Sequence, residues 1–488
     1  MDLASPYCAP RNRKISKLDT RKLASDMIVA FFAQALSVVS SVATTLILPK
    51  FLGIESFGYW QLFIFYVSYI GFFHLGINDG IYLIYGGESR SQIDKRDINS
   101  QFAFSVLYQL FFSILLFCIA LFGPFDEERR FVVSATAILL TVHNAGLFLG
   151  YLFQAMNETK LFSFSAVTES AVFLVGLTLL LAFGITDFKP YILLYCLSRT
   201  ARFFYCLAKS IDIIKSGVKQ FSGMVKSSLS TIRVGIMLMT SNIIGQLILG
   251  VIRFFVDLEW GIETFSIVSF SLSIAAFFLM FLMQVSMVLF PHLRQSTRDS
   301  VETYYVLLRN SLSILLPSLY FLYPLIAFLL NLWLPEYGKS ISLFVFLFPL
   351  CVFEGKMDIV GATYLKVLRH EKKLLKINCL TLAVSFATTL IGTYLFHSVS
   401  FILVCVTLVL GARCYVSERI LDKLMRIDHS STSWSIMVIS VAFIALFRCA
   451  DQPFAFLIYF LIYLVFLFLN KKSLAPLCSS LKKALKKS

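Results

Sequence analysis

The sequence has few charged residues. Asp, Glu, Lys and Arg together make up 15% of its 488 residues, whereas ordinary soluble domains have about 25%. Hydrophobic residues account for 58% and come in runs of about 20, which is enough for a helix to cross a bilayer. The short alternating segments typical of membrane β-barrels are missing. We therefore predict an all-α polytopic membrane protein.

Motifs for cofactors and enzymatic chemistry are also missing. The sequence contains no Walker loop, glycine-rich phosphate cradle, nucleophile elbow or metal-ligand spacing. Its ten cysteines are scattered singly, mostly inside apolar runs, as expected of small buried residues. We expect no cofactor, no metal and no enzymatic activity, so any transport would depend on an ion gradient or on the substrate gradient.

The basic residues indicate the orientation in the membrane. We predict fourteen spans with both termini in the cytoplasm. Of the 43 Lys and Arg residues, five lie in spans, six in outer turns and the other 32 on the cytoplasmic side, as the positive-inside rule requires. This asymmetry explains the net charge of +15 without nucleic acid as a partner. The outer loops, of about ten residues or fewer, leave no room for an outer catalytic domain. The predicted spans cover residues 26–48, 57–77, 101–122, 131–153, 163–185, 190–208, 234–256, 264–288, 307–333, 340–364, 374–396, 398–412, 434–450 and 454–470.

A short internal echo indicates a duplication. The segment Gly-Ile-Glu-Ser-Phe at 53–57 returns as Gly-Ile-Glu-Thr-Phe at 261–265, each time between two apolar spans. Chance similarity in a Phe-rich and Ile-rich chain is the alternative. Internal duplication is common in transporters, and we predict two pseudo-symmetric six-helix lobes. The predicted parts are a basic cytoplasmic arm (1–25), the N-terminal lobe (26–208), a basic amphipathic linker (209–233), the C-terminal lobe (234–425), and two additional spans with a basic cytoplasmic tail (426–488).

Charged residues inside spans are costly and need a partner, a cavity or the interface. Arg202 and Glu169 lie at the same predicted depth in neighbouring spans, and we expect them to form a structural ion pair. Arg199, near the middle of span six, has no obvious acidic partner at its depth. An unpaired arginine there favours a water-filled cavity for an anion, with a buried structural contact as the alternative. Arg253 and Arg309 lie near span ends and could snorkel.

A second group of charges lies in span ten. Lys356 stands between Glu354 and Asp358, and the two carboxylates, four residues apart, share one helix face. The group could be a cation or proton relay, an internal set of salt bridges, or part of a cavity wall.

Several short motifs resemble the polysaccharide-transport branch of the multidrug/oligosaccharidyl-lipid/polysaccharide (MOP) flippase superfamily, in which the O-antigen flippases belong. The likeness covers most of residues 25–425, and its specificity comes from the order and spacing of the motifs. Ile252 departs from the family, where an Asp frequently precedes the arginine of span seven. The motifs are 47–53 with 55–58, 75–77, 234–236, Arg253, 289–293 and 332–337.

The resemblance implies a flippase in a bacterial inner membrane that moves an undecaprenyl-diphosphate-linked oligosaccharide, an O-antigen or capsule repeat, to the periplasmic leaflet. It also implies a polysaccharide polymerase and a chain-length regulator as partners, and two six-helix lobes, with two further helices in fourteen-helix members. We expect Arg199, Arg253 and Lys356 to contact the anionic headgroup, because ionised groups make strong hydrogen bonds to phosphate. Candidates for coupling to H⁺ or Na⁺ are Glu169, Glu354 and Asp358.

Three alternatives stay open. A multidrug antiporter of the same superfamily would favour carboxylates and aromatic rings in its cavity, whereas basic residues outnumber acidic ones in these spans. A membrane-embedded glycan polymerase or acyltransferase would be expected to carry a large outer loop or a catalytic His or Asp near a loop. A scaffold or receptor would not need charges deep in the membrane.

Overall fold

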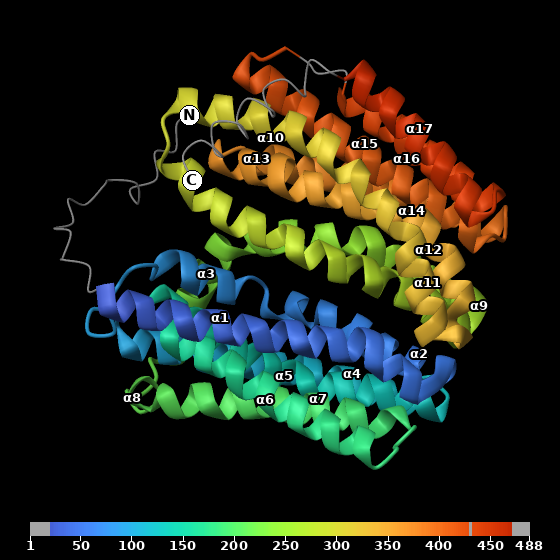
Figure 1. Ribbon diagram of the computed structural model, residues 1–488. Helices are drawn as coiled ribbons and strands as arrows, with labels where there is room; N and C mark the ends of the chain where they lie inside the picture. The colour runs from blue at the N-terminus through green and yellow to red at the C-terminus, as the bar shows by residue number, and fades with distance from the viewer. Residues whose placement is uncertain (1–19, 429–431, 471–488) are drawn as a thin grey trace.

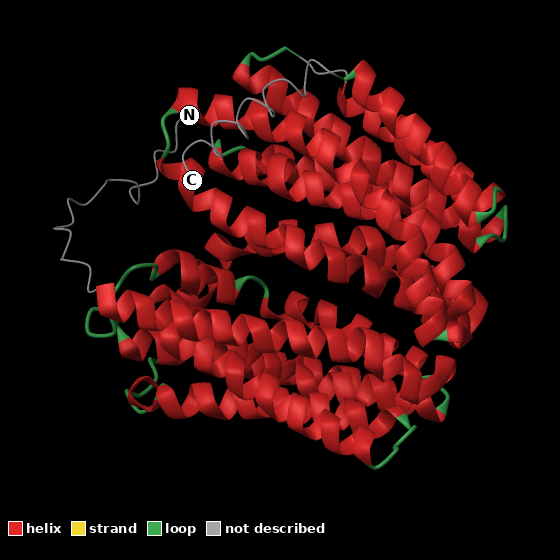
Figure 2. Cartoon of the chain, in the orientation of Figure 1, coloured by secondary structure: helices red, strands yellow, loops and turns green. Residues whose placement is uncertain are grey.

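The computed structural model describes residues 20–428 and 432–470, and the described residues form helices and no strand (Figures 1 and 2). The predicted all-α class is therefore confirmed. The first nineteen residues of the predicted basic arm and the predicted tail beyond residue 470 lie outside the described residues.

The first half of the chain forms one group of packed helices, coloured blue to green in Figure 1. In this group α4 packs on α5, α6 packs on α7, and α1 packs on α6. The elements are α1 (Thr20–Val42), the π-helix η1 (Ala43–Ile47), α2 (Leu48–Tyr69), the 3-10 helix η2 (Ile70–His74), α3 (Ile77–Ile84), α4 (Lys95–Phe122), α5 (Glu127–Ala155), α6 (Thr159–Ala182), α7 (Phe188–Lys209) and α8 (Ile211–Ile214).

The second half forms another group, and the long helix α9 (Phe221–Gln295) runs between the two (Figure 1). In the second group α14 packs on α9 and α15, and α12 packs on the same two helices. The remaining elements are α10 (Arg298–Ser318), η3 (Leu319–Leu322), α11 (Tyr323–Trp333), η4 (Pro335–Tyr337), α12 (Gly338–Lys356), the π-helix η5 (Met357–Ala362), α13 (Thr363–Val367), α14 (Glu371–Tyr394), α15 (Val399–Met425), α16 (Thr432–Cys449) and α17 (Gln452–Leu469).

The helices have the lengths and composition of membrane spans. Within the described residues, nine helices are long and apolar enough to cross a bilayer. Two of them, Ile28–His74 and Phe221–Ser286, are 47 and 66 residues long, and each contains most of two predicted spans. All fourteen predicted spans are largely helical. The chain is therefore a multi-pass membrane protein, while the count of fourteen crossings and their orientation stay predictions.

The sequence echo corresponds to a structural echo. Gly53 interrupts α2 with φ 70° and ψ 177°, and Gly261 interrupts α9 with φ 76° and ψ −175°. This backbone region is accessible essentially to glycine alone. The turn predicted at each motif is thus a kink at a single glycine, which lets two spans follow one another without a loop.

A second structural echo has no sequence counterpart. Asn157 and Arg369 both have φ 58° and end helices with the same pair of hydrogen bonds. The amide of Glu158 donates to the carbonyl of Phe153 at 2.8 Å, and that of His370 to Leu365 at 2.7 Å. The amides of Asn157 and Arg369 each donate three residues back, to Gln154 and Lys366, at 3.1 Å. These are Schellman motifs, and the matching positions support the predicted duplication.

Contacts join the two groups at the ends predicted to face outward. Tyr337 Oη donates to the carbonyl of Gly53 at 3.1 Å, and Trp333 Nε1 donates to the carbonyl of Leu46 at 2.7 Å. Arg129 of α5 binds Asp257 of α9 through two hydrogen bonds of 2.7 Å each. Such bidentate pairs fix both distance and orientation.

The segment predicted to be a cytoplasmic linker, residues 209–233, is docked on the first group. Lys219 Nζ lies 2.5 Å from Asp97 Oδ1, and Ser227 Oγ donates to the same carboxylate at 2.8 Å. Arg90 reaches Glu158 at 2.6 Å and Asp212 at 2.7 Å. The hydrogen bonds that Arg90 donates to Glu158 are the main cause of its raised pKa, and the negative charges of Glu158 and Asp212 raise this pKa further. These contacts fasten the residues before and at the start of α9 to the first group.

We expect Gly261→Ala to destabilise the protein by about 1–3 kcal/mol, because alanine is strained at this φ and ψ. A Cβ at Gly261 would meet no atom within 4 Å, so the cost comes from the backbone alone. The matched control is Gly245→Ala in the same helix, where the new Cβ would meet only Asn378 Nδ2 at 4.0 Å and alanine improves helix propensity. Thermal unfolding of both purified variants tests this. Equal stability of the two would contradict the strained kink.

Candidate functional site

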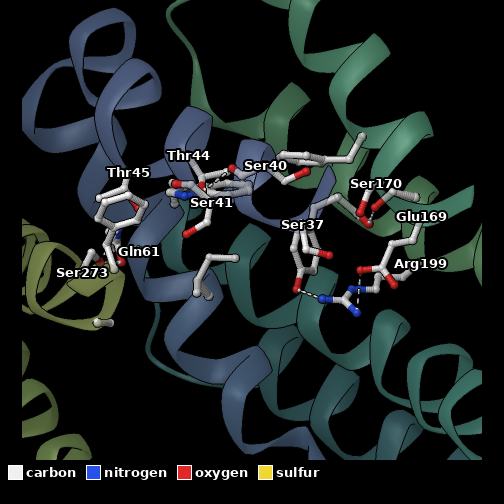
Figure 3. Close-up of a pocket in the computed structure, with 17 residues that line it drawn as sticks. Ser37, Ser40, Ser41, Thr44, Thr45, Gln61, Glu169, Ser170, Arg199 and Ser273 are labelled. Atoms are coloured by element: carbon white, nitrogen blue, oxygen red, sulfur yellow. Dashed lines mark hydrogen bonds and ion pairs between the residues drawn. The ribbon is translucent and has the colours of Figure 1, made fainter. Parts of the chain in front are cut away.

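A cavity of about 430 Å³ lies among α1, η1, α2, α6, α7 and α9, so residues from both halves of the chain line it (Figure 3). Hydroxyl groups from α1 and η1 follow one side of it. Glu169 and Arg199 lie at one end, and Gln61 and Ser273 lie at the other. Its lining residues are Ser37, Ser40, Ser41, Thr44, Thr45, Trp60, Gln61, Ile64, Glu169, Ser170, Phe173, Tyr195, Ser198, Arg199, Ser273, Ala276 and Phe277.

The hydroxyl-bearing side of the cavity is formed by five Ser and Thr residues of α1 and η1, which follow one another at alternating intervals of three residues and one residue. This spacing puts all five on one face. Ser37 Oγ donates to the carbonyl of Ala33 at 3.0 Å, and Thr44 Oγ1 to that of Ser40 at 2.9 Å. Their lone pairs remain as acceptors, while Ser40 Oγ is buried with no partner among the described residues. Sequence reasoning missed this face, although the spacing of Ser and Thr in span one carries the signal. The five residues are Ser37, Ser40, Ser41, Thr44 and Thr45.

Two arginines share one carboxylate at the end of the cavity. Arg202 Nη1 lies 2.8 Å from Glu169 Oε2, so the two side chains expected to pair are in contact. Arg199 Nη1 lies 2.7 Å from Glu169 Oε1, so the expectation that Arg199 has no acidic partner was wrong. The Glu169 carboxylate has two oxygens and binds both arginines, whereas the prediction from depth in the membrane gave it Arg202 as its one partner. Two guanidinium groups and one carboxylate leave a net charge of +1.

Arg199 is held in place on its other side by Tyr195. Its Nη2 donates to Tyr195 Oη at 2.7 Å, and the guanidinium lies 4.9 Å from the centre of that ring. The Nε atoms of Arg199 and Arg202 are buried with no hydrogen-bond partner among the described residues. The Arg199 side chain is nevertheless 20% exposed, so a ligand in the cavity can reach it.

Gln61 of α2 and Ser273 of α9 connect the two halves across the cavity. Gln61 Nε2 donates to Ser273 Oγ at 3.2 Å. Both groups can also bind a polar ligand, because an amide and a hydroxyl each donate and accept. The cavity wall therefore offers hydroxyls, one amide, a net positive charge and aromatic rings.

Lys356 does not line this cavity. Its Nζ lies 2.5 Å from Glu418 Oε1, and both side chains are 1% exposed. Glu354 binds Arg413 at 2.7 Å, and Arg413 Nε also donates to Asn378 at 3.2 Å. The group in span ten is thus largely an internal set of salt bridges, one of the three interpretations left open. Sequence reasoning missed Glu418 and Arg413 as partners because both were placed beyond the end of span twelve.

Three further charged residues lie elsewhere. Asp358 lies in the π-helix η5, half-buried, and its carboxylate has no ion pair among the described residues. Arg253 of α9 is half-buried and also has no ion pair or hydrogen bond within the described residues. Arg309 does not snorkel as expected. Its Nη1 lies 2.6 Å from Asp422 Oδ1, and both side chains are 4% exposed. Among the described residues, no group of three or more His, Cys, Asp or Glu side chains could hold a metal ion.

Solved transporters share this fold. The lipid II flippase MurJ in an inward closed conformation is 16% identical and matches with a TM-score of 0.62, over 92% of this chain and 98% of that one. A multidrug resistance MATE family transporter of the MOP superfamily, facing inward, is 12% identical with a TM-score of 0.59, over 82% and 98%. No protein-family model and no curated protein matches the sequence. The chain therefore has the fold of MOP superfamily transporters.

We expect Lys356→Met to destabilise the protein by about 3–5 kcal/mol, because it removes the cation from a buried carboxylate. The double variant Lys356→Met/Glu418→Leu should recover most of the loss, since removing both charges is often neutral. Lys366→Met is the matched control, exposed at the end of the same continuous helical segment, and should change the stability by less than about 0.5 kcal/mol. Thermal unfolding of the purified variants is the measurement. A stable Lys356→Met protein that no longer transports would instead make Lys356 a ligand of the substrate.

Proposed function

We propose that this protein is a flippase for a lipid-linked oligosaccharide, with undecaprenyl diphosphate as the lipid carrier and an O-antigen or capsule repeat as the sugar. The cavity carries the proposal, because it combines a net positive group with a continuous row of hydroxyls between the two halves of a MOP-type fold. Diphosphate needs cationic partners, and sugars need groups that donate and accept hydrogen bonds.

The headgroup would bind in the cavity while the polyprenyl tail stays in the lipid. Arg199 contacts phosphate, and the hydroxyls from α1 and η1 with Gln61 and Ser273 contact sugar. Arg253, which keeps no ionic partner among the described residues, is a second phosphate contact in the outer half of the membrane. Lys356 has a structural role in this proposal. The two lobes rock around the cavity, so the headgroup never crosses hydrocarbon.

Release on the periplasmic side would supply a polymerase and its chain-length regulator. In this proposal the chain lies in a bacterial inner membrane with both termini in the cytoplasm, and a flippase needs no enzymatic step.

Asp358 is the best placed of the three candidates for coupling to H⁺ or Na⁺. Glu169 and Glu354 are both engaged by arginines, whereas Asp358 has no ion pair among the described residues. It also lies in a π-helical segment, a feature frequent at functional sites.

A cation-coupled multidrug antiporter is the second candidate. The cavity wall contains the Glu169 carboxylate together with Trp60, Phe173, Tyr195 and Phe277, and a cationic drug could use both kinds of group. The net charge of +1 on the shared arginine group favours an anion over such a drug.

We expect a strain without the gene to lose its surface polysaccharide and to accumulate single undecaprenyl-linked repeats on the cytoplasmic face. Wild type and the exposed control Lys160→Ala should restore the polymer. Arg199→Ala should fail at normal protein levels, because the headgroup loses its charged contact. Mass spectrometry of lipid-linked intermediates, with a probe for leaflet, is the measurement. Unchanged glycan together with drug sensitivity would indicate the antiporter, and repeats on the outer face would indicate a polymerase.

We expect Asp358→Asn to abolish the dependence of transport on an ion gradient while leaving binding of the lipid-linked substrate within about twofold. Asparagine keeps the size of the side chain but cannot lose a proton or carry a charge. Uptake into proteoliposomes with imposed H⁺ or Na⁺ gradients tests this. Full gradient dependence in the variant would exclude Asp358.

A further inference from the structure

Glu169 occupies the position that an anionic ligand of Arg199 would take. Its Oε1 atom lies 2.7 Å from Arg199 Nη1, and both residues belong to the cavity wall. The side chains of Arg199 and Glu169 are 20% and 17% exposed. A phosphate in the cavity would therefore compete with this carboxylate for the same guanidinium.

The second arginine allows Glu169 to leave Arg199 without becoming unpaired. Glu169 Oε2 stays 2.8 Å from Arg202 Nη1, and the Arg202 side chain is only 11% exposed. Arg202 also does not line the cavity. If an anion replaces Glu169 at Arg199, each arginine keeps one anionic partner, so no charge is left unpaired in a region of low polarity.

The other buried ion pairs lack this arrangement. Lys356 with Glu418 is 1% exposed, Arg309 with Asp422 is 4% exposed, and the side chains of Arg413 and Glu354 are 7% and 16% exposed. None of these pairs lines the cavity described above. Within the described residues, the shared carboxylate at Arg199 is thus the buried ion group that this cavity reaches.

We propose that Glu169 is a resident substitute for the phosphate of the substrate. A phosphate oxygen displaces Glu169 from Arg199 on binding, while Glu169 remains on Arg202. On release the carboxylate returns to Arg199, which favours departure of the substrate and leaves Arg199 with an anionic partner in the empty site. The inference rests on the proposed flippase function for the identity of the displacing group, and it makes Glu169 a positioning residue instead of an ion carrier.

The test is anion binding to full-length Glu169→Ala in lipid nanodiscs, with inorganic pyrophosphate as the probe and melting temperature as the readout. Sodium chloride keeps the ionic strength constant. The variant vacates the volume of the carboxylate and raises the charge of the group from +1 to +2. We expect its apparent Kd for pyrophosphate to be at least tenfold lower than that of wild type, with a saturable rise in melting temperature.

Two controls separate this role from a purely structural one. Glu169→Ala/Arg199→Gln removes the guanidinium that would receive the anion and should lose the saturable response. Asp422→Ala frees a buried arginine that this cavity does not reach and should gain no response. If Glu169→Ala does not fold, Glu169→Gln serves instead, with a smaller gain because the amide still fills the site.

The outcomes separate this inference from the proposed function. If neither Glu169 variant gains affinity for pyrophosphate, while the wild-type protein restores surface glycan, the inference is overturned and the proposed flippase function stands. A gain that persists in Glu169→Ala/Arg199→Gln would also overturn it, because the anion would then bind elsewhere. If the gain in pyrophosphate affinity requires Arg199, but deletion of the gene leaves surface glycan unchanged, the result would support the anion site and contradict the flippase.

Discussion

The cost of an unpaired charge in hydrocarbon governs the packing of this protein. A charged side chain deep in a membrane must meet an opposite charge or water, and here the partners come from different helices. Glu169 of α6 meets Arg199 and Arg202 of α7. In the other half α15 alone supplies Arg413 to α12, Glu418 to Lys356 and Asp422 to Arg309. Apolar side chains can slide along one another at little cost in lipid, whereas these pairs hold a helix in one register.

Both halves contain ion pairs between helices, but these pairs differ in their access to the cavity. Two of the pairs around α15, Lys356 with Glu418 and Arg309 with Asp422, are almost fully buried, and all three pairs join α15 to neighbouring helices. The group around Glu169 opens onto the cavity and has one more cation than anion. The kinks at Gly53 and Gly261 match between the two halves, whereas the charged groups differ, because the group around Glu169 lines the cavity and the pairs around α15 do not.

Much of the architecture could be predicted from composition, span length and a five-residue echo, because these depend on local properties of the chain. The partners of buried charges could not. Arg199 was expected to be unpaired because depth along a helix says nothing of how many neighbours one carboxylate serves. Lys356 was expected near a cavity because span twelve was ended at residue 412 and the rest of its helix was placed in the cytoplasm. The helix α15 continues to Met425 and brings Glu418 against Lys356. The hydroxyl face of α1 and η1 could have been predicted from the spacing of Ser and Thr, but it contains no charged residue, and the search for site residues in the spans was based on charge.

The long helix α9 is anchored in both halves of the molecule, and this has a mechanical consequence. Ser227, at its start, is bound to Asp97 of α4 in the first half. Twenty-one residues further on, the carbonyl of Ile248 accepts a hydrogen bond from Ser385 of α14 in the second. If the two halves rotate against each other, as the proposed transport cycle requires, a helix fixed to both must bend or twist between its two anchors. Gly245 lies in this stretch, where an added Cβ would meet only Asn378 Nδ2 at 4.0 Å, so any rocking of the lobes would have to bend or twist about six helical turns of α9.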